Sequence, residues 1–440
     1  MNNIIIPLDS PQHNIFAILF VLPENGQKAI QQSTRKGEQM QIKDITRLLV
    51  PGNLWRFIVS LVDWRTCIRK VTGHPAVDAV FISNMRDDTD RITFNGDWHP
   101  QSGHFAGPRY IMGNINARVR AIDSITADLL SSQGRKRAKD QFIAAVQWAE
   151  NRGAQVALLA ASTKRLFGED GKTLKTQFPN IVFTIGDNGT TCLLLQEISY
   201  ALTKAGLNSV ISRIGVLGPY GILGRQVTEA LVDKGYNVVG AGPNAAALKG
   251  LAQELPIETC TSFQDMGKVD AVICCTHSDK IRLTAGHVDI IRYDGKKLLV
   301  VDVAEPSNLT KEEYERCRKV VIRQDAGNAY NPKLKYVLGA LSYRMFRLTR
   351  GVTFGCFAET MALTAALKRG ENIKDVDWFS VNKDNMHLVE KQFSLEGFTT
   401  PTPRCFGKTV KSFNLNLCED RIRPQVAAKF DRPEASVAAE

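Results

Sequence analysis

The stretch SRIGVLGPYGILGRQVTEALVDKGYNVVGAG, residues 212–242, contains the pattern that decides the fold. A short apolar run ends at Gly218, and further glycines follow at Gly221 and Gly224. The next segment has the apolar spacing of an amphipathic helix, and a second apolar run lies at Asn237–Gly240. This order of strand, glycine turn, helix and strand predicts a βαβ unit.

A glycine turn that opens a helix lets backbone N–H groups approach a pyrophosphate, and the helix N-terminus favours negative charge. The pattern therefore predicts a dinucleotide site, although a tight turn in another kind of α/β protein has the same spacing. The residues expected to contact the cofactor are those of the turn, Gly218, Pro219, Tyr220, Gly221, Ile222, Leu223 and Gly224.

The end of the second strand should contact the adenine ribose. No aspartate or glutamate occurs from Gly240 to Lys249, so the usual carboxylate partner of a free 2′-hydroxyl is missing. This favours NADPH, with Asn244 and Lys249 as phosphate contacts. NADH stays open, because Pro243 stands where an arginine would have decided the question.

Two later apolar runs, residues 269–275 and 296–304, predict further strands whose carboxyl ends face the same crevice. Thr276 and His277 follow the first run, and Asp302 lies near the end of the second. We expect Thr276 and Asp302 to contact the cofactor. His277 can donate a proton to a developing alkoxide, but a loop histidine without that duty is an equal alternative.

Strand patterns also occur at residues 16–22, 76–85 and 154–162, and a helical pattern occurs at 140–150. Residues 179–191 predict a strand that runs into a polar loop. We expect an irregular loop at 95–113 and interrupted helices from Asn331 to Arg369. The fold class predicted is α/β with two domains: a C-terminal Rossmann-type doubly wound parallel sheet and an N-terminal α/β substrate domain. The expected ranges are 1–190 for the substrate domain, 191–330 for the NAD(P)-binding domain, 331–411 for a C-terminal helical segment, and 412–440 for a poorly ordered tail.

Composition limits the class of protein. With 44% apolar and 23% charged residues, the chain is typical of a globular protein, and the absence of a long apolar run or a signal sequence favours the cytoplasm. Nine scattered cysteines, with no ladder of metal-ligand spacing, predict neither a disulfide scaffold nor a metal site. The net charge of +11 fits an acidic partner, but it is not accompanied by a nucleic-acid motif, and a solvated basic surface explains it equally well.

The segment TFGCFAETM, residues 353–361, places Cys356 where a helical pattern begins. If Thr353 caps this helix, the thiol lies in the first turn, where the helix dipole favours the thiolate. Glu359 lies one turn further on the same face. Phe354, Phe357 and Met361 form either an apolar wall beside a reactive thiol or part of the core, and free cysteines are themselves often buried.

Three segments, VLGPYGILG (216–224), DVAEPSNL (302–309) and FGCFAETMAL (354–363), resemble in sequence and order the long-chain acyl-(acyl-carrier-protein) reductases that form fatty aldehydes in cyanobacteria. The likeness extends over residues 110–370. It departs from the family at Pro243, where the family has an arginine.

This resemblance implies an NAD(P)H-dependent reductase that converts an acyl thioester to an aldehyde, with Cys356 as nucleophile in a CFAE motif that includes Glu359. The thioester donor would be an acyl-carrier protein or acyl-CoA. The donor to the oxyanion would come from Thr190, Thr163 or the loop at Thr276–His277.

Two other functions stay open. One is a ketone/alcohol oxidoreductase of the shikimate dehydrogenase type without covalent catalysis, for which Lys164 and Asp187 would be the catalytic pair. The other is a dinucleotide-binding module that does not catalyse a reaction.

Overall fold

A computed structural model describes residues 63–95, 100–276, 278–337 and 348–417. The chain divides into two compact units. Unit 1 contains the described residues up to Gly186 together with 331–352 and 356–397, and unit 2 contains 187–330, 353–355 and the described residues from Phe398 on. The strand expected at residues 16–22 lies outside the described residues.

Unit 1 is a mixed sheet with helices on both faces. Its elements are α5 (Trp64–Val71), β1 (Ala79–Met85), α6 (Asp88–Asn95), β2 (His104–Met112), β3 (Ile115–Ile125), η1 (Asp128–Leu130), α7 (Ser132–Glu150), β4 (Val156–Leu159), η2 (Ala161–Arg165), α8 (Lys172–Gln177), β5 (Val182–Thr184), β13 (Leu334–Tyr336), α15 (Gly355–Lys368) and α16 (Lys383–Glu396). The strand order is β13-β2-β3-β1-β4-β5, with β1, β3, β4 and β5 parallel and β2 antiparallel to β3.

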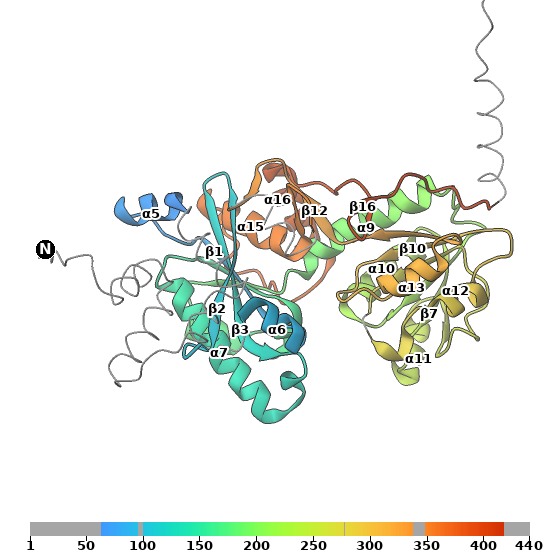
Figure 1. Ribbon diagram of the computed structural model, residues 1–440, viewed down its shortest axis with the longest axis horizontal. Coiled ribbons are helices and arrows are strands. Elements are labelled where there is room, and N and C mark those ends of the chain that lie inside the picture. Colours follow the sequence, from blue (N-terminus) through green and yellow to red (C-terminus); the bar gives the residue numbers. More distant parts are fainter. Residues whose placement is uncertain (1–62, 96–99, 277, 338–347, 418–440) are drawn as a thin grey trace, which may run out of the picture. The chain divides into compact units, whose positions relative to one another are not determined.

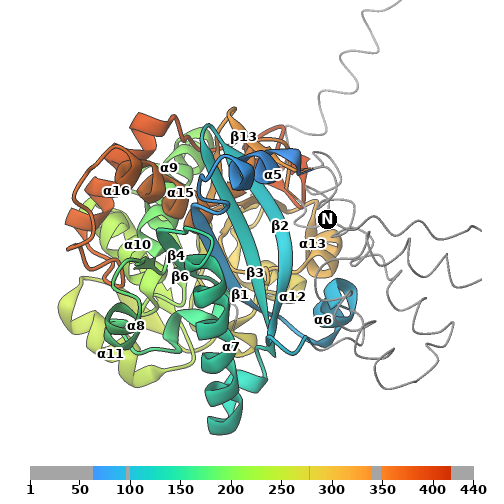
Figure 2. The same cartoon turned by 90° about the vertical axis from the view of Figure 1, so that its left-hand side faces the viewer.

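The two faces of this sheet are covered by different helices. Phe142 and Val146 of α7 pack with Val80 and Ile82 of β1 on one face, where α7 crosses the strands (Figure 2). On the other face, the ring of Phe357 in α15 stacks on Phe81 of β1 with centroids 4.1 Å apart. The helix that contains Cys356 is therefore anchored in the core of unit 1.

Unit 2 contains α9 (Asp187–Lys204), β6 (Arg213–Leu217), α10 (Ile222–Asp233), β7 (Asn237–Ala241), α11 (Ala245–Glu254), β8 (Glu258–Cys260), β9 (Ala271–Cys274), η3 (Asp279–Ile281), α12 (Ala285–Ile291), β10 (Leu298–Asp302), α13 (Lys311–Cys317), β11 (Val321–Asp325), β12 (Asn328–Tyr330), β14 (Val352–Phe354), β15 (Arg404–Cys405) and β16 (Lys408–Thr409). β14 and α15 each cross the boundary of the units by one residue, Val352 and Gly355 respectively.

The strand order in unit 2 is β8-β7-β6-β9-β10-β11, all parallel, and β15 and β16 extend the β11 edge in antiparallel fashion. Counted from β6, this is the order 3-2-1-4-5-6 of a doubly wound dinucleotide-binding sheet. Helices α9 and α10 pack on one face, and α12 and α13 on the other (Figure 1). The predicted α/β class with a Rossmann-type sheet is confirmed.

Some local predictions were wrong. Residues 104–112 form β2 instead of an irregular loop, because a register shift between Ala106 and Arg109 accommodates Gly107 and Pro108 within the strand. Residues 187–191 form the first turn of α9, where an acidic residue at Asp187 suits the helix dipole.

Two predictions for the C-terminal region also need correction. Part of the region expected to be helical, Leu334–Tyr336, is strand β13, and its alternating burial fits a strand. The tail is ordered at its start, because Phe413 and Leu415 are buried and Asn416 forms a bridge with Lys296. The rest of the tail, from residue 418, lies outside the described residues.

Candidate functional site

The turn after β6 gives its three glycines different tasks. Gly218 has a φ of +77°, and its N–H donates to the carbonyl of Ala241 at 2.8 Å. A Cβ on Gly224 would lie 2.0 Å from the Gly218 carbonyl oxygen, whereas a Cβ on Gly221 would meet nothing closer than 3.3 Å. Gly224 therefore permits the helix to pack on the turn, and Gly221 leaves room for a pyrophosphate at the helix N-terminus.

The rest of the turn is braced against the second strand. The hydroxyl oxygen of Tyr220 accepts the backbone N–H of Asn244 at 3.2 Å. A Cβ on Gly242 would lie 2.6 Å from Cε1 of Tyr220, and a Cβ on Gly240 would lie 2.8 Å from Cγ of Pro219. Pro219 and Tyr220 thus hold the turn next to the β7–α11 loop, where the adenine ribose binds in this fold.

The side chain of Asn244 already has a structural task. Its Oδ1 accepts the N–H of Ala247 at 3.1 Å and caps α11. Lys249 is exposed on the same helix. Within the turn, Ile222 is 36% exposed, and Leu223 packs against the core under α9 and α10. The preference for NADPH over NADH stays a prediction.

The loop after β9 lies next to the glycine turn. A Cβ on Gly218 would be 2.7 Å from Cβ of Thr276, and Oγ1 of Thr276 accepts the N–H of Ser278 at 3.2 Å. His277 lies outside the described residues. Burial and the negative charge of Asp302 raise the pKa of the Cys274 and Cys275 thiols well above the usual range, which favours the protonated form of both.

Asp302 does not have the role that the sequence suggested. Its side chain is fully buried and forms an ion pair with Arg323, with 2.9 Å between Oδ2 and the guanidinium. Its carboxylate also accepts the N–H groups of Ala304, Asn308 and Leu309. A carboxylate enclosed in this way holds the loop after β10 in shape, and we no longer assign it as a direct cofactor contact.

Asn308, which the sequence reasoning missed, connects the loops after β9 and β10. Its Nδ2 donates to the carbonyls of Thr276 at 2.8 Å and Ile281 at 3.2 Å, and its Oδ1 accepts the N–H of Leu283 at 2.9 Å. Its position, six residues after Asp302 in DVAEPSNL, was visible in the sequence, but the three partners are defined only by the fold. Asn308 therefore orders the loop expected to lie near the nicotinamide.

Cys356 is partly exposed and lies in the first turn of α15. Gly186, in the turn after β5, packs directly on it, since a Cβ on Gly186 would lie 2.2 Å from Cβ of Cys356. The helix begins at Gly355, and Thr353 lies in strand β14. Oγ1 of Thr353 has no hydrogen-bond partner among the described residues, so the prediction that it caps the helix is wrong.

Glu359 acts on the turn that covers Cys356. Its side chain is buried, and its Oε1 accepts a short hydrogen bond from Oγ1 of Thr184. The same hydroxyl oxygen accepts the N–H of Gly186 at 2.9 Å. The carboxyl group therefore orients the Gly186 turn.

The apolar neighbours of Cys356 belong to the core. Phe357 is 5% exposed and packs on Phe81 and Tyr110, and Met361 is fully buried. Phe354 lies in β14 and is partly exposed. Of the two alternatives for Phe357 and Met361, the core is therefore confirmed and the apolar wall beside the thiol is wrong, because their surfaces are covered by protein atoms.

The two threonines considered as oxyanion donors differ in environment. Thr163 is fully buried, and its hydroxyl donates to the carbonyl of Ala160 at 2.6 Å, so it is committed to the fold. Thr190 is partly exposed in the first turn of α9, and its Oγ1 would lie 3.1 Å from a Cβ on Gly355. Thr190 remains the better candidate of the two.

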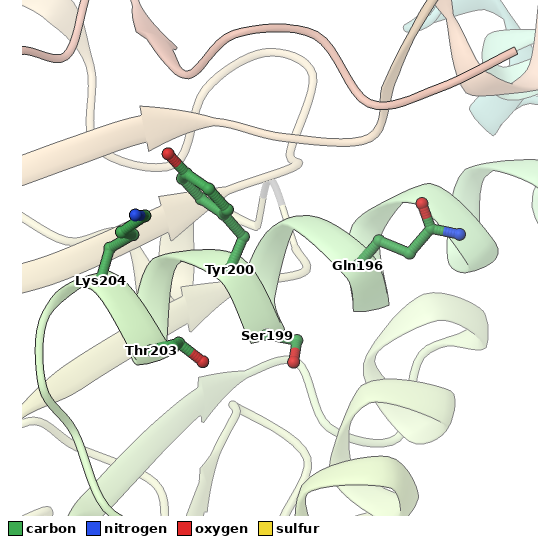
Figure 3. A pocket seen from close by; sticks show the side chains of 5 residues that line it. All are labelled: Gln196, Ser199, Tyr200, Thr203 and Lys204. Atoms are coloured by element: carbon green, nitrogen blue, oxygen red, sulfur yellow. The ribbon is translucent and has the colours of Figure 1, made fainter.

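Other surface features do not add to this site. A shallow hollow lies along the exposed face of α9 (Figure 3) and is lined by Gln196, Ser199, Tyr200, Thr203 and Lys204.

Within the described ranges, no group of three His, Cys, Asp or Glu side chains is placed to hold a metal ion. No helix in the described part of the chain is long and apolar enough to cross a membrane.

Residues 201–322 match the sequence model of the shikimate / quinate 5-dehydrogenase family. This segment runs from the end of α9 to β11 and includes the glycine turn and both loops described above. It ends before Cys356. A search of curated proteins found no significant match.

Several solved structures match this chain at low sequence identity and low TM-score. Shikimate dehydrogenase from Aquifex aeolicus has 15% identity and a TM-score of 0.30, with 72% of this chain and 97% of that one covered. L-tryptophan dehydrogenase from Nostoc punctiforme has 11% identity and a TM-score of 0.35, with 73% and 89% covered. A probable 2-hydroxyacid dehydrogenase from Rhizobium etli CFN 42, solved with NADP, has 12% identity and a TM-score of 0.30, with 70% and 100% covered.

The family-model match agrees with the strand order and the glycine geometry of unit 2. Together they support an oxidoreductase of the dinucleotide-binding type with an NAD(P) cofactor. They do not extend to the chemistry of the substrate.

Proposed function

We propose that the protein is an NAD(P)H-dependent reductase of an acyl thioester, with Cys356 as the nucleophile. The observation that supports this most is the position of Cys356 in the first turn of α15, partly exposed and covered by a glycine turn that Glu359 holds through Thr184. The first turn of a helix stabilises a thiolate, because its N–H groups carry partial positive charge.

In the proposed reaction, the Cys356 thiolate attacks the thioester carbonyl, and the tetrahedral adduct expels the thiol of the donor. A thioacyl group then remains on Cys356. Bound NAD(P)H supplies a hydride to the carbonyl carbon of this group. Collapse of the second adduct releases the aldehyde and restores the thiolate. Thr190 is our candidate for hydrogen bonding to the developing oxyanion.

The thioester donor in this proposal is an acyl-carrier protein or acyl-CoA. The net charge of +11 suits an acidic carrier. Part of the positive charge lies on α7, at Arg135, Lys136, Arg137 and Lys139, although Arg137 is paired with Asp128. Nucleic acid is not an expected partner, and we propose the cytoplasm as the location.

A second candidate function is favoured by the family-model match. It is a ketone/alcohol oxidoreductase of the shikimate dehydrogenase type, which transfers hydride without a covalent intermediate. For this reaction, Lys164 in η2 and Asp187 at the start of α9 are the residues to test. The match covers the cofactor segment only, so it is compatible with either substrate.

The deciding experiment measures acylation of the enzyme without a reductant. The protein is incubated with acyl-CoA thioesters of several chain lengths, and the intact mass and the modified peptide are determined. We expect one acyl group on Cys356 in the wild type and in Cys67→Ala, and none in Cys356→Ala. Cys67 is the matched control because it is an exposed cysteine.

Turnover then separates the two candidates. Cys356→Ala should abolish aldehyde formation from thioesters. If no thioester acylates the wild type, and Cys356→Ala retains NAD(P)-dependent activity on shikimate, quinate or a related hydroxy acid, the second candidate replaces the first.

A further inference from the structure

Glu197 is a buried carboxyl on α9 of unit 2. Its side chain is 2% exposed, and its Oε2 accepts the backbone N–H of Gly327 at 2.6 Å. Gly327 follows β11 with a φ of +78°, and a Cβ there would lie 2.6 Å from Cγ2 of Val303. The Gly327 peptide is thus held by the hydrogen bond to Glu197 and by close packing against Val303.

Gly327 in turn holds the start of α15. Its carbonyl oxygen accepts the N–H of Gly355 at 2.9 Å. A Cβ on Gly355 would lie 2.8 Å from that oxygen and 2.8 Å from Cα of Thr190. Gly355 therefore lies between the Gly327 loop and the first turn of α9. Thr190 contacts Gly355 directly, and Glu197, two turns further along the same helix, holds the Gly327 loop.

We propose that Glu197 is a positioning residue for Cys356: through the Gly327 peptide it fixes Gly355, to which Cys356 is joined by a peptide bond. The consequence for turnover rests on the proposed role of Cys356 as a nucleophile. The consequence for the reactivity of the thiol does not, because alkylation requires no substrate or cofactor.

The charge of Glu197 changes in an accessible pH range. Burial raises the pKa of its carboxyl to about 8. Hydrogen bonds from the N–H groups of Gly327 and Asn328 oppose this shift, and the negative charge of Asp325 on β11 adds to it. Asp325 is itself paired with Arg323, at 2.5 Å. With the pKa raised in this way, deprotonation of Glu197 adds a negative charge close to the peptide that holds Gly355, which disfavours a thiolate on the next residue.

The test measures the alkylation rate of Cys356 by iodoacetamide from pH 6 to 10, read from the mass of the peptide that contains it. We expect the wild type to show an inflection near pH 8 in addition to the titration of the thiol, and Glu197→Gln to lack it. Glu197→Ala, which also removes the acceptor of the Gly327 N–H, should react roughly tenfold more slowly across the range. Gln196→Ala, exposed on the same helix, is the matched control and should behave as the wild type.

A profile for Glu197→Gln identical to that of the wild type overturns the proposal, and so does a folded Glu197→Ala protein that reacts at the wild-type rate. Folding of each variant is checked by thermal unfolding. If thioesters do not acylate the wild type but alkylation still depends on Glu197, the proposed function fails and this inference stands.

Discussion

A Cβ placed on Gly186 would lie 2.2 Å from Cβ of Cys356 and 2.6 Å from its Cα. Gly186 also has a φ of +72°. The first turn of the cysteine helix is therefore packed against a peptide that only glycine can provide, within unit 1.

Gly186→Ala should lower the free energy of unfolding by more than the strain of a left-handed alanine alone. We expect a loss of about 1 kcal/mol from the left-handed backbone and a further ~1–3 kcal/mol from overpacking, together with slower alkylation of Cys356. Chemical denaturation and thiol alkylation measure the two effects. The control is Gly370→Ala, just after the end of α15, where the glycine has a φ of +82° and open space around it. It should show only the loss that comes from the left-handed backbone. Equal behaviour of the two variants would contradict the packing argument.

Substitutions at two glycines of the turn after β6 should have different effects, one on folding and the other on cofactor binding. Gly224→Ala meets the Gly218 carbonyl oxygen at 2.0 Å and should destabilise unit 2. Gly221→Ala meets nothing closer than 3.3 Å, so the fold should persist, while the added methyl group weakens binding of the pyrophosphate. Titration with NADPH and NADH, followed by fluorescence, measures the dissociation constants. Unchanged binding in Gly221→Ala would mean that the dinucleotide does not approach this turn.

Asn308→Ala should weaken binding of the cofactor by loosening the loop after β9. The variant leaves the carbonyls of Thr276 and Ile281 and the N–H of Leu283 without their partner, which costs ~1–3 kcal/mol. The control is Asn385→Ala in unit 1, which removes similar bonds to the carbonyls of Asp377 and Ser380. Both variants should be less stable on thermal unfolding, but the dissociation constant for NAD(P)H should rise only for Asn308→Ala.

Asp78 should stabilise the protein in a pH-dependent way. Although burial opposes its ionisation, bonds from Arg69, Lys368 and the N–H of Asn116 hold the pKa of this carboxyl below its usual value. A lowered pKa in the folded state gives stability that is present above the unfolded pKa and is lost as pH falls through the folded pKa. Asp78→Asn should cost ~1–3 kcal/mol at pH 7, since it removes the buried negative charge that pairs with Arg69 and Lys368. This difference should shrink at pH 3.

Denaturation with urea at pH 7 and pH 3 measures this effect. Asp289→Asn is the matched control, because Asp289 is exposed and pairs with Arg292 on the surface. Its effect should stay below about 1 kcal/mol. A cost for Asp78→Asn that does not change with pH would show that the carboxyl contributes through its shape and not through its charge.

The βαβ unit of unit 2 could be predicted from residues that are close together in the chain. A strand, a glycine turn and a helix are set by local periodicity and by the backbone freedom of Gly218. The sequence alone therefore predicted β6, α10 and β7. The dinucleotide site at the turn between β6 and α10 stays a prediction. Prediction from the sequence failed at β2, because Gly107 and Pro108 are typical of a loop, yet a register shift in the pairing with β3 accommodates both within the strand.

The surroundings of Cys356 were decided by the tertiary structure. The motif placed a thiol at the start of a helix, but periodicity could not tell a wall facing a substrate from a core, and Phe357 proved to be stacked on Phe81. The side chains that hold the turns around the site, Thr184, Glu197 and Asn308, have partners far away in the sequence. Local spacing specifies backbone conformation, whereas a buried polar group acquires its partner only when the chain closes around it.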